Sequence, residues 1–436
     1  MSRFTLLALG TVAAFAGPLM AQTRADSAAA ARTAYRQAVA QFRRGDTAQA
    51  HAGMRRAYEA WPTQPAYLIA LASVAARSRD TAEAVQILGR LADLGLTHGV
   101  DADPDFASVK TSPAFERVAA RLRANAEPKP RSRVFRTVEE TDLFPEGISH
   151  DPMTGAIFLS SVRHRKVIRI DSTGAVTDFL SPGQDSLWSV LGVRVDPARR
   201  LLWLSTVETP YMTGSPPNAN PRTGLAAFDL GTKRLVWRWV LPADSTPHFF
   251  GDLLVSSAGD VYTTDSSSPL LIRVRRTAAG YVADTVAISP LFRSLQGLAL
   301  SSDERTLYVA DYSLGILAVD LARHTVKPLA SDAGVSVLGV DGMVRYGTAL
   351  IGIQNGAAPL RVIRMDLSAD GARITGVHEL DRHLPLADQP TIGTLWGDRF
   401  FYVANSLWDW YDEGGKLKPG ATLPRPTVLE LDLAKP

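Results

Sequence analysis

The feature that most constrains this chain is an apolar strand pattern that recurs six times after residue 155. Each copy follows a short strand pattern, such as QGLAL (296–300), and precedes another, such as VIRMDL (362–367); most copies also have a fourth. Four short strands repeated six times at this period are typical of a six-bladed β-propeller. The sequence therefore predicts a mainly β fold, with a propeller over residues 134–433. The six copies begin 43 to 59 residues apart and read AIFLSSV (156–162), LLWLSTV (201–207), DVYTTDS (260–266), TLYVADY (306–312), ALIGIQN (349–355) and FFYVANS (400–406).

The last copy ends on its third strand, at Leu433. The segment RVFRTVE (133–139), directly ahead of the first copy, has the composition of a strand and is available as the missing fourth one. We predict that it completes the last blade, because this pairing would close the ring and remove an exposed sheet edge.

Residues 28–126 have a different pattern, in which alanine is abundant and leucines and alanines recur at helical spacing. GDTAQA (45–50) returns as RDTAEA (79–84), and a helix–turn–helix period of 34 residues resembles the tetratricopeptide repeat. Asp46 and Asp80 are expected to cap the helices that follow them. We expect a small helical domain that either docks a peptide or protein partner or serves only as a structural extension. EPKPRSR (127–133) is predicted to be a linker.

The N-terminus has the pattern of a secretory signal peptide over residues 1–21, with Arg3, an apolar run and a predicted cleavage after Ala21. A membrane anchor is the alternative, although the run is short for a bilayer. We therefore expect a periplasmic or secreted protein with no stable membrane span after cleavage.

The composition excludes several classes of function. The chain has no cysteine, so it has no disulfide framework, thiolate metal site or catalytic thiol. Its 47 basic residues barely exceed its 44 acidic ones and form no basic run, which disfavours nucleic acid as a partner. A GxSxG nucleophile elbow and a phosphate-binding glycine loop are also absent from the sequence.

The propeller geometry predicts which residues share one rim. Strands within a blade are antiparallel, so the start of each first strand and the end of each second strand lie on the same face. The long loops 208–224 and 406–420 fall on this face, and long loops on rigid scaffolds often carry sites. The predicted rim residues are Glu146, Leu191, Gly251, Asp252, Gln296, Asp341 and Ile392 at first strands, and Ser161, Glu208, Asp265, Asp311, Asn355 and Asn405 at second strands.

Four motifs carry a family resemblance: PEG (145–147), GDLLVSSAGDVYTTDS (251–266), QGLALSSDERTLYVADY (296–312) and DGM (341–343). In their order and blade spacing, residues 134–433 resemble the senescence-marker-protein, gluconolactonase and luciferin-regenerating-enzyme-like propellers, and more distantly the paraoxonase-type esterases. The resemblance implies one divalent metal, often calcium, in the channel mouth. It also implies that the metal polarises a lactone or ester carbonyl and that an aspartate serves as base.

Carried over by motif, the resemblance makes Glu146 and Asp341 metal ligands and Asp341 also the base. The two asparagine ligands of the family fall on Gln296 and on Gly251, which is followed by Asp252. We therefore expect Glu146, Asp341, Gln296 and Asp252 to hold the metal. Carboxylate and amide oxygens suit calcium or magnesium better than zinc or copper.

Four other rim positions are candidate site residues. His248 is a candidate catalytic base or an ordinary loop histidine. Asn355 is a candidate substrate contact, and Asn405 is a candidate substrate contact or a turn cap. Trp408 is a candidate substrate contact or part of the packing over the last blade. Taken together, the residues predict an exported, metal-dependent hydrolase of lactones or related esters. The alternative is a non-catalytic propeller that binds a small molecule, peptide or protein, with the helical repeats as its docking surface.

Overall fold

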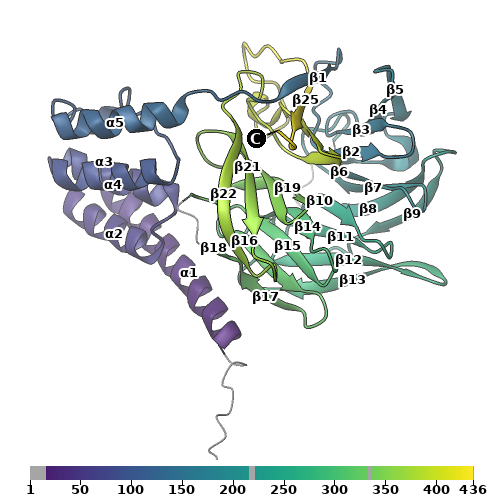
Figure 1. The fold of residues 1–436 in the computed structure, drawn as a ribbon, viewed down its shortest axis with the longest axis horizontal. Coiled ribbons are helices and arrows are strands. Elements are labelled where there is room, and N and C mark those ends of the chain that lie inside the picture. Colours follow the sequence, from purple (N-terminus) through teal and green to yellow (C-terminus); the bar gives the residue numbers. More distant parts are fainter. Residues whose placement is uncertain (1–15, 216–220, 332–334, 436) are drawn as a thin grey trace, which may run out of the picture.

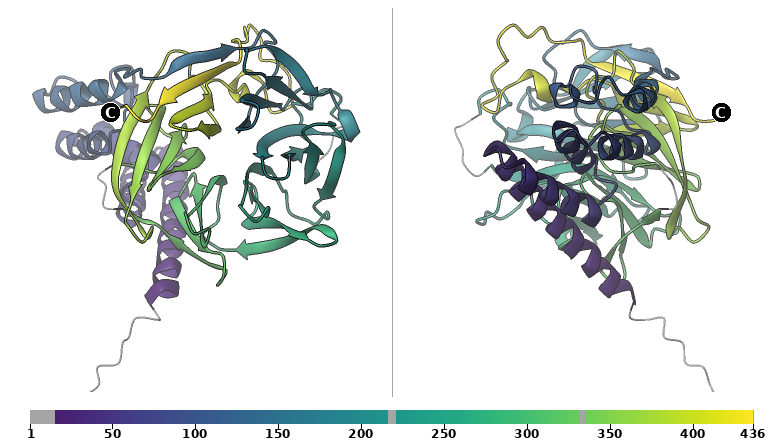
Figure 2. Two further views of the ribbon diagram at one scale, coloured as in Figure 1. Left: turned by 45° about the vertical axis from the view of Figure 1, so that its right-hand side comes forward. Right: turned by 90° about the vertical axis from the view of Figure 1, so that its left-hand side faces the viewer.

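The computed structural model describes residues 16–215, 221–331 and 335–435, and its strands form six sheets arranged in a ring (Figure 2). The predicted six-bladed propeller is confirmed. Blade 1 contains β2 (Ile148–Asp151), β3 (Ala156–Ser161), β4 (Lys166–Ile170) and β5 (Val176–Leu180). Blade 2 contains β6 (Ser189–Asp196), β7 (Leu201–Val207), β8 (Thr223–Asp229) and β9 (Leu235–Val240). Blade 3 contains β10 (Phe250–Val255), β11 (Val261–Asp265), β12 (Leu270–Thr277) and β13 (Gly280–Ile288). Blade 4 contains β14 (Leu295–Leu300), β15 (Thr306–Asp311), β16 (Gly315–Asp320) and β17 (Thr325–Pro328). Blade 5 contains β19 (Val340–Tyr346), β20 (Ala349–Gln354), β21 (Arg361–Leu367) and β22 (Arg373–Arg382), and the short β18 (Ala330–Ser331) pairs parallel with β22 at its edge. Blade 6 contains β23 (Gly393–Trp396), β24 (Arg399–Val403) and β25 (Thr427–Asp432), and β1 (Arg133–Thr137) is its fourth strand.

Neighbouring blades pack face to face, which explains why the second strands are almost completely buried and rich in apolar residues. Every residue of β7 is buried, and Leu202 and Leu204 belong to the same apolar cluster as Phe158 of blade 1. A strand that is covered on both faces needs no alternation with polar residues. The core therefore lies between the blades, around the ring.

The inner strands approach one another closely at glycines. A side chain at Gly297 would place its Cβ 2.4 Å from the carbonyl oxygen of Asp341 in the next blade. At Gly147 the corresponding distance to the carbonyl oxygen of Leu191 is 2.3 Å. These glycines give the backbones of adjacent blades the room they need.

The ring closes as predicted, because β1 pairs antiparallel with β25 in the sixth blade. Val134 lies opposite Leu429 in this pairing, and Thr137 lies opposite Thr427. Charged groups support the pairing from the sheet face: Glu430 accepts hydrogen bonds from Arg399 Nε at 2.6 Å and from Arg133 Nη2 at 2.9 Å. The first strand of the propeller is thereby fastened to the last.

We expect Glu430→Gln to destabilise the protein by about 1–3 kcal/mol, since the two arginines would lose their carboxylate. The hydrogen bond from Arg399, with help from Arg133, lowers the pKa of Glu430 from 4.5 to about 2. Its contribution is therefore complete above pH 4.5 and is lost as the pH falls through about 2. Urea midpoints at pH 7 measure the effect, and Glu413→Gln, an exposed position, is the control. Equal midpoints for the two variants would show that this ion pair does not secure the closure.

The described residues ahead of the propeller form five α-helices and a short 3₁₀ turn at Pro104–Phe106. The helices are α1 (Ala16–Arg43), α2 (Thr47–Ala60), α3 (Pro65–Arg77), α4 (Thr81–Asp93) and α5 (Pro113–Ala126). They lie on one side of the propeller, beside β22 (Figure 1). The predicted caps are present: Asp46 accepts from Gln49 N–H and Asp80 from Glu83 N–H, each at 3.0 Å. The 34-residue repeat thus marks equivalent helix starts, while its assignment to the tetratricopeptide family stays a prediction.

The helices pack onto the propeller at two places. Ala57, Trp61 and Tyr67 share an apolar cluster with Leu291 and Phe292, which lead into blade 4. Further along the chain, Thr97 N–H donates to the carbonyl of Ala358 at 2.9 Å, and Arg361 Nη1 donates to the carbonyl of Gly95 at 3.0 Å. The helical region therefore rests on blades 4 and 5.

The predicted linker 127–133 runs along β22. Arg382 Nε donates to the carbonyl of Glu127 at 2.8 Å, and Ser132 N–H donates to Asp381 Oδ2 at 3.0 Å. These bonds give the backbone of the segment fixed partners, as a chain segment at a packed surface requires. The division into a helical domain over 28–126 and a propeller over 134–433 stays a prediction.

Much of the predicted signal peptide, residues 1–21, lies outside the described residues, so its cleavage stays a prediction. Within the described ranges, none of the helices combines the length and apolar character that crossing a membrane requires.

Candidate functional site

A cavity of about 490 Å³ opens at the rim where the first strands begin, and we call it the central cavity. It brings together six of the residues predicted from sequence, which come from all blades but the second: Glu146, Asp252, Gln296, Asp341, Asn355 and Trp408. Gly251, Leu191 and Ile392, the other first-strand positions, also line it. The rim residues predicted at the starts of the first strands therefore line one cavity in the structure.

Glu146 lies just before β2 and is buried, with 9% of its surface exposed. Its Oε2 accepts hydrogen bonds from Trp408 Nε1 at 2.8 Å and from Ser406 Oγ at 2.9 Å, both supplied by the loop after β24. Burial, together with the nearby charge of Asp341, raises the pKa of Glu146 from 4.5 to about 8. Glu146 therefore binds a proton near neutral pH unless a cation compensates its charge.

Asp341, in β19, is held by an amide. Asn355 Nδ2 donates to Asp341 Oδ2 at 2.6 Å and also to the carbonyl of Pro390 at 2.8 Å, and the Tyr312 hydroxyl donates to Asn355 Oδ1. Burial, helped by the charge of Asp252, raises the pKa of Asp341 from 3.8 to about 7. The hydrogen bond from Asn355 opposes this shift. A carboxyl group with this pKa exchanges protons readily at neutral pH.

Asp252, in β10, is the third buried carboxylate of the central cavity. Its Oδ1 accepts from Arg194 Nη2 at 3.3 Å and from Leu253 N–H at 2.7 Å. Its buried Oδ2 accepts no hydrogen bond from the described part of the chain. Burial raises the pKa of Asp252, and the charge of Arg194 opposes the shift. An unsatisfied, buried carboxylate oxygen is costly and indicates a position for a ligand.

These donors fit a hard cation by their chemistry. Three buried carboxylates and the Gln296 amide are the oxygen ligands that calcium and magnesium use. Gly251 offers no side chain, and a Cβ there would meet its nearest atom, Ser266 Oγ, at 3.4 Å. In the described ranges, Glu146, Asp252 and Asp341 do not form a set whose oxygens all lie within 4.8 Å of one another. A cation at this site would therefore take further oxygens from Gln296 or water.

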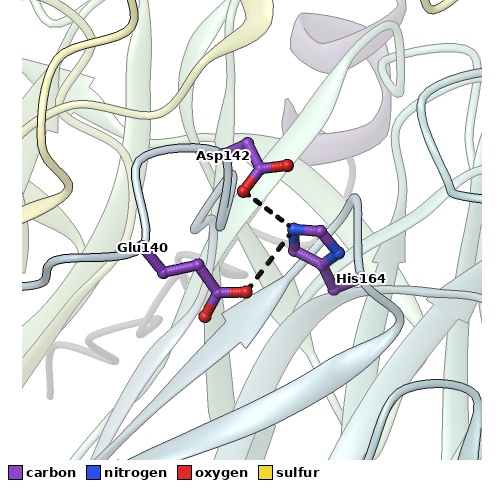
Figure 3. Close-up of side chains that lie close together, drawn as sticks. All are labelled: Glu140, Asp142 and His164. Atoms are coloured by element: carbon purple, nitrogen blue, oxygen red, sulfur yellow. Dashed lines mark ion pairs between the residues drawn. The ribbon is translucent and has the colours of Figure 1, made fainter.

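A second acidic cluster lies nearby and is shown in Figure 3. Glu140, Asp142 and His164 offer ligand atoms within 4.8 Å of one another, which makes them a possible metal site. Both carboxylates already have cationic neighbours, since Lys166 Nζ lies 2.9 Å from Glu140 and Arg163 Nε lies 3.6 Å from Asp142. The sequence analysis missed this cluster because the histidine comes from the turn after β3 and the two acids from the loop before β2.

His248 and Asn405 do not line the central cavity. His248 Nδ1 pairs with Asp265 at 2.5 Å and its Nε2 with Asp244 at 3.3 Å, beside a separate, smaller cavity. Burial lowers the pKa of His248, but the two carboxylates outweigh burial and raise it. Asn405 bonds backbone on both sides, donating to the Arg425 carbonyl at 3.0 Å and accepting from Thr427 N–H at 2.8 Å. Neither residue is placed to contact a ligand in the central cavity.

Trp408 both packs and lines the central cavity. It lies in a 3₁₀ turn, Trp408–Trp410, and its ring meets Phe144 edge-on at 4.8 Å between centroids and Tyr211 at 5.2 Å. These contacts, together with the bond to Glu146, fix one aromatic wall of the cavity. Trp408 therefore takes part in packing, as one interpretation predicted, and it also lines the cavity in which the other interpretation expects a substrate contact.

The sequence analysis also missed several lining residues. Tyr312 directly follows Asp311 at a second-strand end, so the rim rule, extended by one residue, would have found it. Asp388 and Gln389 lie in the loop that leads from β22 into blade 6, and no motif marks them. The missed lining residues are Phe249, Ser266, Tyr312, Leu360, Asp388, Gln389, Thr391 and Asp409.

No protein-family model matches this sequence, and no curated protein matches it significantly. Among solved structures, the chain is similar to a gluconolactonase from Xanthomonas campestris, with 17% identity, 70% of this chain and 95% of that chain covered, and a TM-score of 0.46. It is similar to regucalcin, a calcium-binding protein from Agrobacterium tumefaciens, with 17% identity, 69% and 92% covered, and a TM-score of 0.47. A chain of a mitotic checkpoint complex gives 9% identity, 70% and 96% covered, and a TM-score of 0.45. The chain is a six-bladed propeller, structurally similar at low identity to gluconolactonases and regucalcin.

Proposed function

We propose that the central cavity hydrolyses lactones or related esters with the help of a divalent cation of the calcium type. One observation carries the proposal: Glu146, Asp252 and Asp341 are buried around one cavity, and among the described residues that line it there is no lysine, arginine or histidine. A cation would relieve the repulsion among these carboxylates, which explains why such a set would be kept.

Asp341 is the proposed base. Its pKa is about 7 in the metal-free protein, and a bound cation would favour the ionised form that can take a proton from an attacking water. Asn355 orients it through Oδ2, and Tyr312 and the carbonyl of Pro390 in turn orient Asn355. When bound, a divalent cation supplies Lewis-acid polarisation of the carbonyl and lowers the pKa of water.

Glu146 and Asp252 are the proposed anionic partners of the cation, with Gln296 as an amide donor. Trp408 and Ser406 hold the Glu146 carboxylate in place through Oε2. Asp252 keeps Oδ2 available, while Arg194 Nη2 and the N–H of Leu253 donate to Oδ1. We further propose that residues 1–21 direct the protein to the periplasm or the medium, where calcium is abundant enough to fill such a site.

The test combines metal analysis with an activity panel. We expect about one equivalent of calcium in the purified protein, turnover of part of a lactone and aryl-ester panel, and loss of that turnover with a chelator. Because the Glu140 cluster is a competing metal site, His164→Gln serves as the matched control and should retain both metal and activity.

Two outcomes contradict the proposal. Metal that disappears with His164→Gln but not with Glu146→Gln would place the ion at the other cluster. A protein that binds the panel compounds without any turnover, with or without calcium, would be the non-catalytic binding propeller.

A further inference from the structure

The central cavity is lined by acidic side chains both at its base and at its mouth. Five carboxylates line it, and its lining in the described part of the chain contains no basic side chain. Glu146, Asp252 and Asp341 lie buried at its base, whereas Asp388 and Asp409 are exposed at its mouth. The two mouth residues come from neighbouring loops, since Asp409 N–H donates to the side chain of Gln389 at 3.3 Å.

The nearby positive charges do not balance these five carboxylates. Arg194 pairs with Asp252 at 3.3 Å from outside the lining, and Lys418 Nζ bonds the backbone carbonyl of Asp409 at 2.7 Å. A divalent cation at the base would compensate Glu146, Asp252 and Asp341 there, and it would leave Asp388 and Asp409 without a cationic side chain in the lining of the described chain. The mouth therefore keeps a negative potential even with the cation bound, and a concave, poorly solvated wall strengthens that potential.

Two further observations indicate a ligand that carries positive charge. Asp252 is 4% exposed and lines the cavity, and its Oδ2 has no hydrogen-bond donor. Aromatic side chains also line the cavity: Trp408, directly before Asp409, and Phe249, whose ring centroid lies 6.4 Å from that of Trp408. Carboxylates beside aromatic rings are the surroundings in which proteins bind ammonium groups.

We propose that the substrate is an ester or lactone with an ammonium group, which lies at the mouth near Asp388, Asp409 and Trp408 while the carbonyl lies at the base near Asp341. The ester part of this assignment rests on the proposed function; the charge preference does not. Esters that carry a phosphate or carboxylate are disfavoured by the same field.

The test uses two pairs of probes that differ in charge at nearly constant shape. Choline and 3,3-dimethylbutanol measure binding by calorimetry, and acetylcholine and 3,3-dimethylbutyl acetate measure hydrolysis, all with calcium-loaded protein. We expect the cationic member to be favoured about tenfold or more in Kd and in kcat/KM, with a preference that falls as salt rises.

Substitutions at the mouth of the cavity test which residues cause the preference for the cationic probe. The double change Asp388→Asn with Asp409→Asn should reduce the cationic-to-neutral ratio by about tenfold. Glu413→Gln, an exposed position on the same loop that does not line the cavity, should leave the ratio unchanged.

The outcomes separate the two proposals. Choline binding with no hydrolysis of any ester would keep the charge preference and contradict the hydrolase. Hydrolysis of both esters at equal rates would keep the hydrolase and overturn the ammonium assignment. The absence of any preference in binding, including no binding of either alcohol at millimolar concentration, would also overturn it.

Discussion

Asp341→Asn should lower kcat for the best lactone or ester substrate by about a thousandfold at pH 7.5, with the protein still folded. The substitution keeps the size of the side chain and its contact with Asn355, but an amide cannot take a proton from water. It also removes one of the carboxylates that would compensate a cation. The measurement is steady-state kinetics at saturating calcium, so that weaker metal binding does not account for the loss.

The control is Asp370→Asn, the same chemical change at an exposed turn between β21 and β22. It should leave kcat within about twofold, as surface substitutions usually do. Wild-type kcat in the Asp341→Asn protein would show that Asp341 is not the base. A loss that excess calcium restores would reduce its role to metal binding.

The metal-free protein should lose stability as the pH rises from 5 to 8, and calcium should restore it. The pKa of Glu146 rises on folding from 4.5 to about 8, and that of Asp341 from 3.8 to about 7, because burial and neighbouring carboxylates disfavour their charged forms. Between those limits the folded state binds more protons than the unfolded state, so the free energy of unfolding falls as the pH rises. The expected loss is on the order of a few kcal/mol.

Calcium should reverse this trend, because a bound cation favours the ionised carboxylates. We expect calcium at about a hundredfold excess over its Kd to stabilise the protein by about 3 kcal/mol at pH 8 and by much less at pH 5. Thermal unfolding at both pH values, with chelator or calcium, measures the effect.

Two variants separate the contribution of Glu146 and Asp341 to the pH dependence of stability from that of other titrating groups. A Glu146→Gln, Asp341→Asn double variant should lack both the loss between pH 5 and 8 and the calcium effect, whereas His164→Gln should keep them. A calcium effect of equal size at both pH values would mean that the ion binds away from these carboxylates.

The blade pattern of this chain is predictable because it follows from strand spacing. Buried strands such as β7 are rich in apolar residues, and the copies recur at blade intervals, so the ring, its closure by β1 and the cavity rim follow from topology. The rim placed Glu146 and Asp341 correctly at one cavity without any alignment.

The direction of each rim side chain is not predictable in the same way. Asn355 and Asn405 end the second strands of adjacent blades, yet Asn355 donates to Asp341 whereas Asn405 bonds the backbone of Arg425 and Thr427. The choice depends on which unsatisfied group the next loop presents, and the loops of different blades share no sequence. His248 and the Glu140 cluster are unpredictable for the same reason, since their partners come from loops distant in the chain.

The pairing of β1 with β25 also sets an order of events during synthesis. Arg133 and Glu430 are 297 residues apart, so at 5–20 residues per second β1 leaves the ribosome roughly 15–60 s before its partner exists. In that interval blades 1 to 5 can complete, while β1 remains a strand with free edges. Its sequence, RVFRT, places two arginines within five residues, and such charges discourage pairing with a wrong strand. One of the arginines that holds the finished ring closed thus also protects the unfinished chain from aggregation.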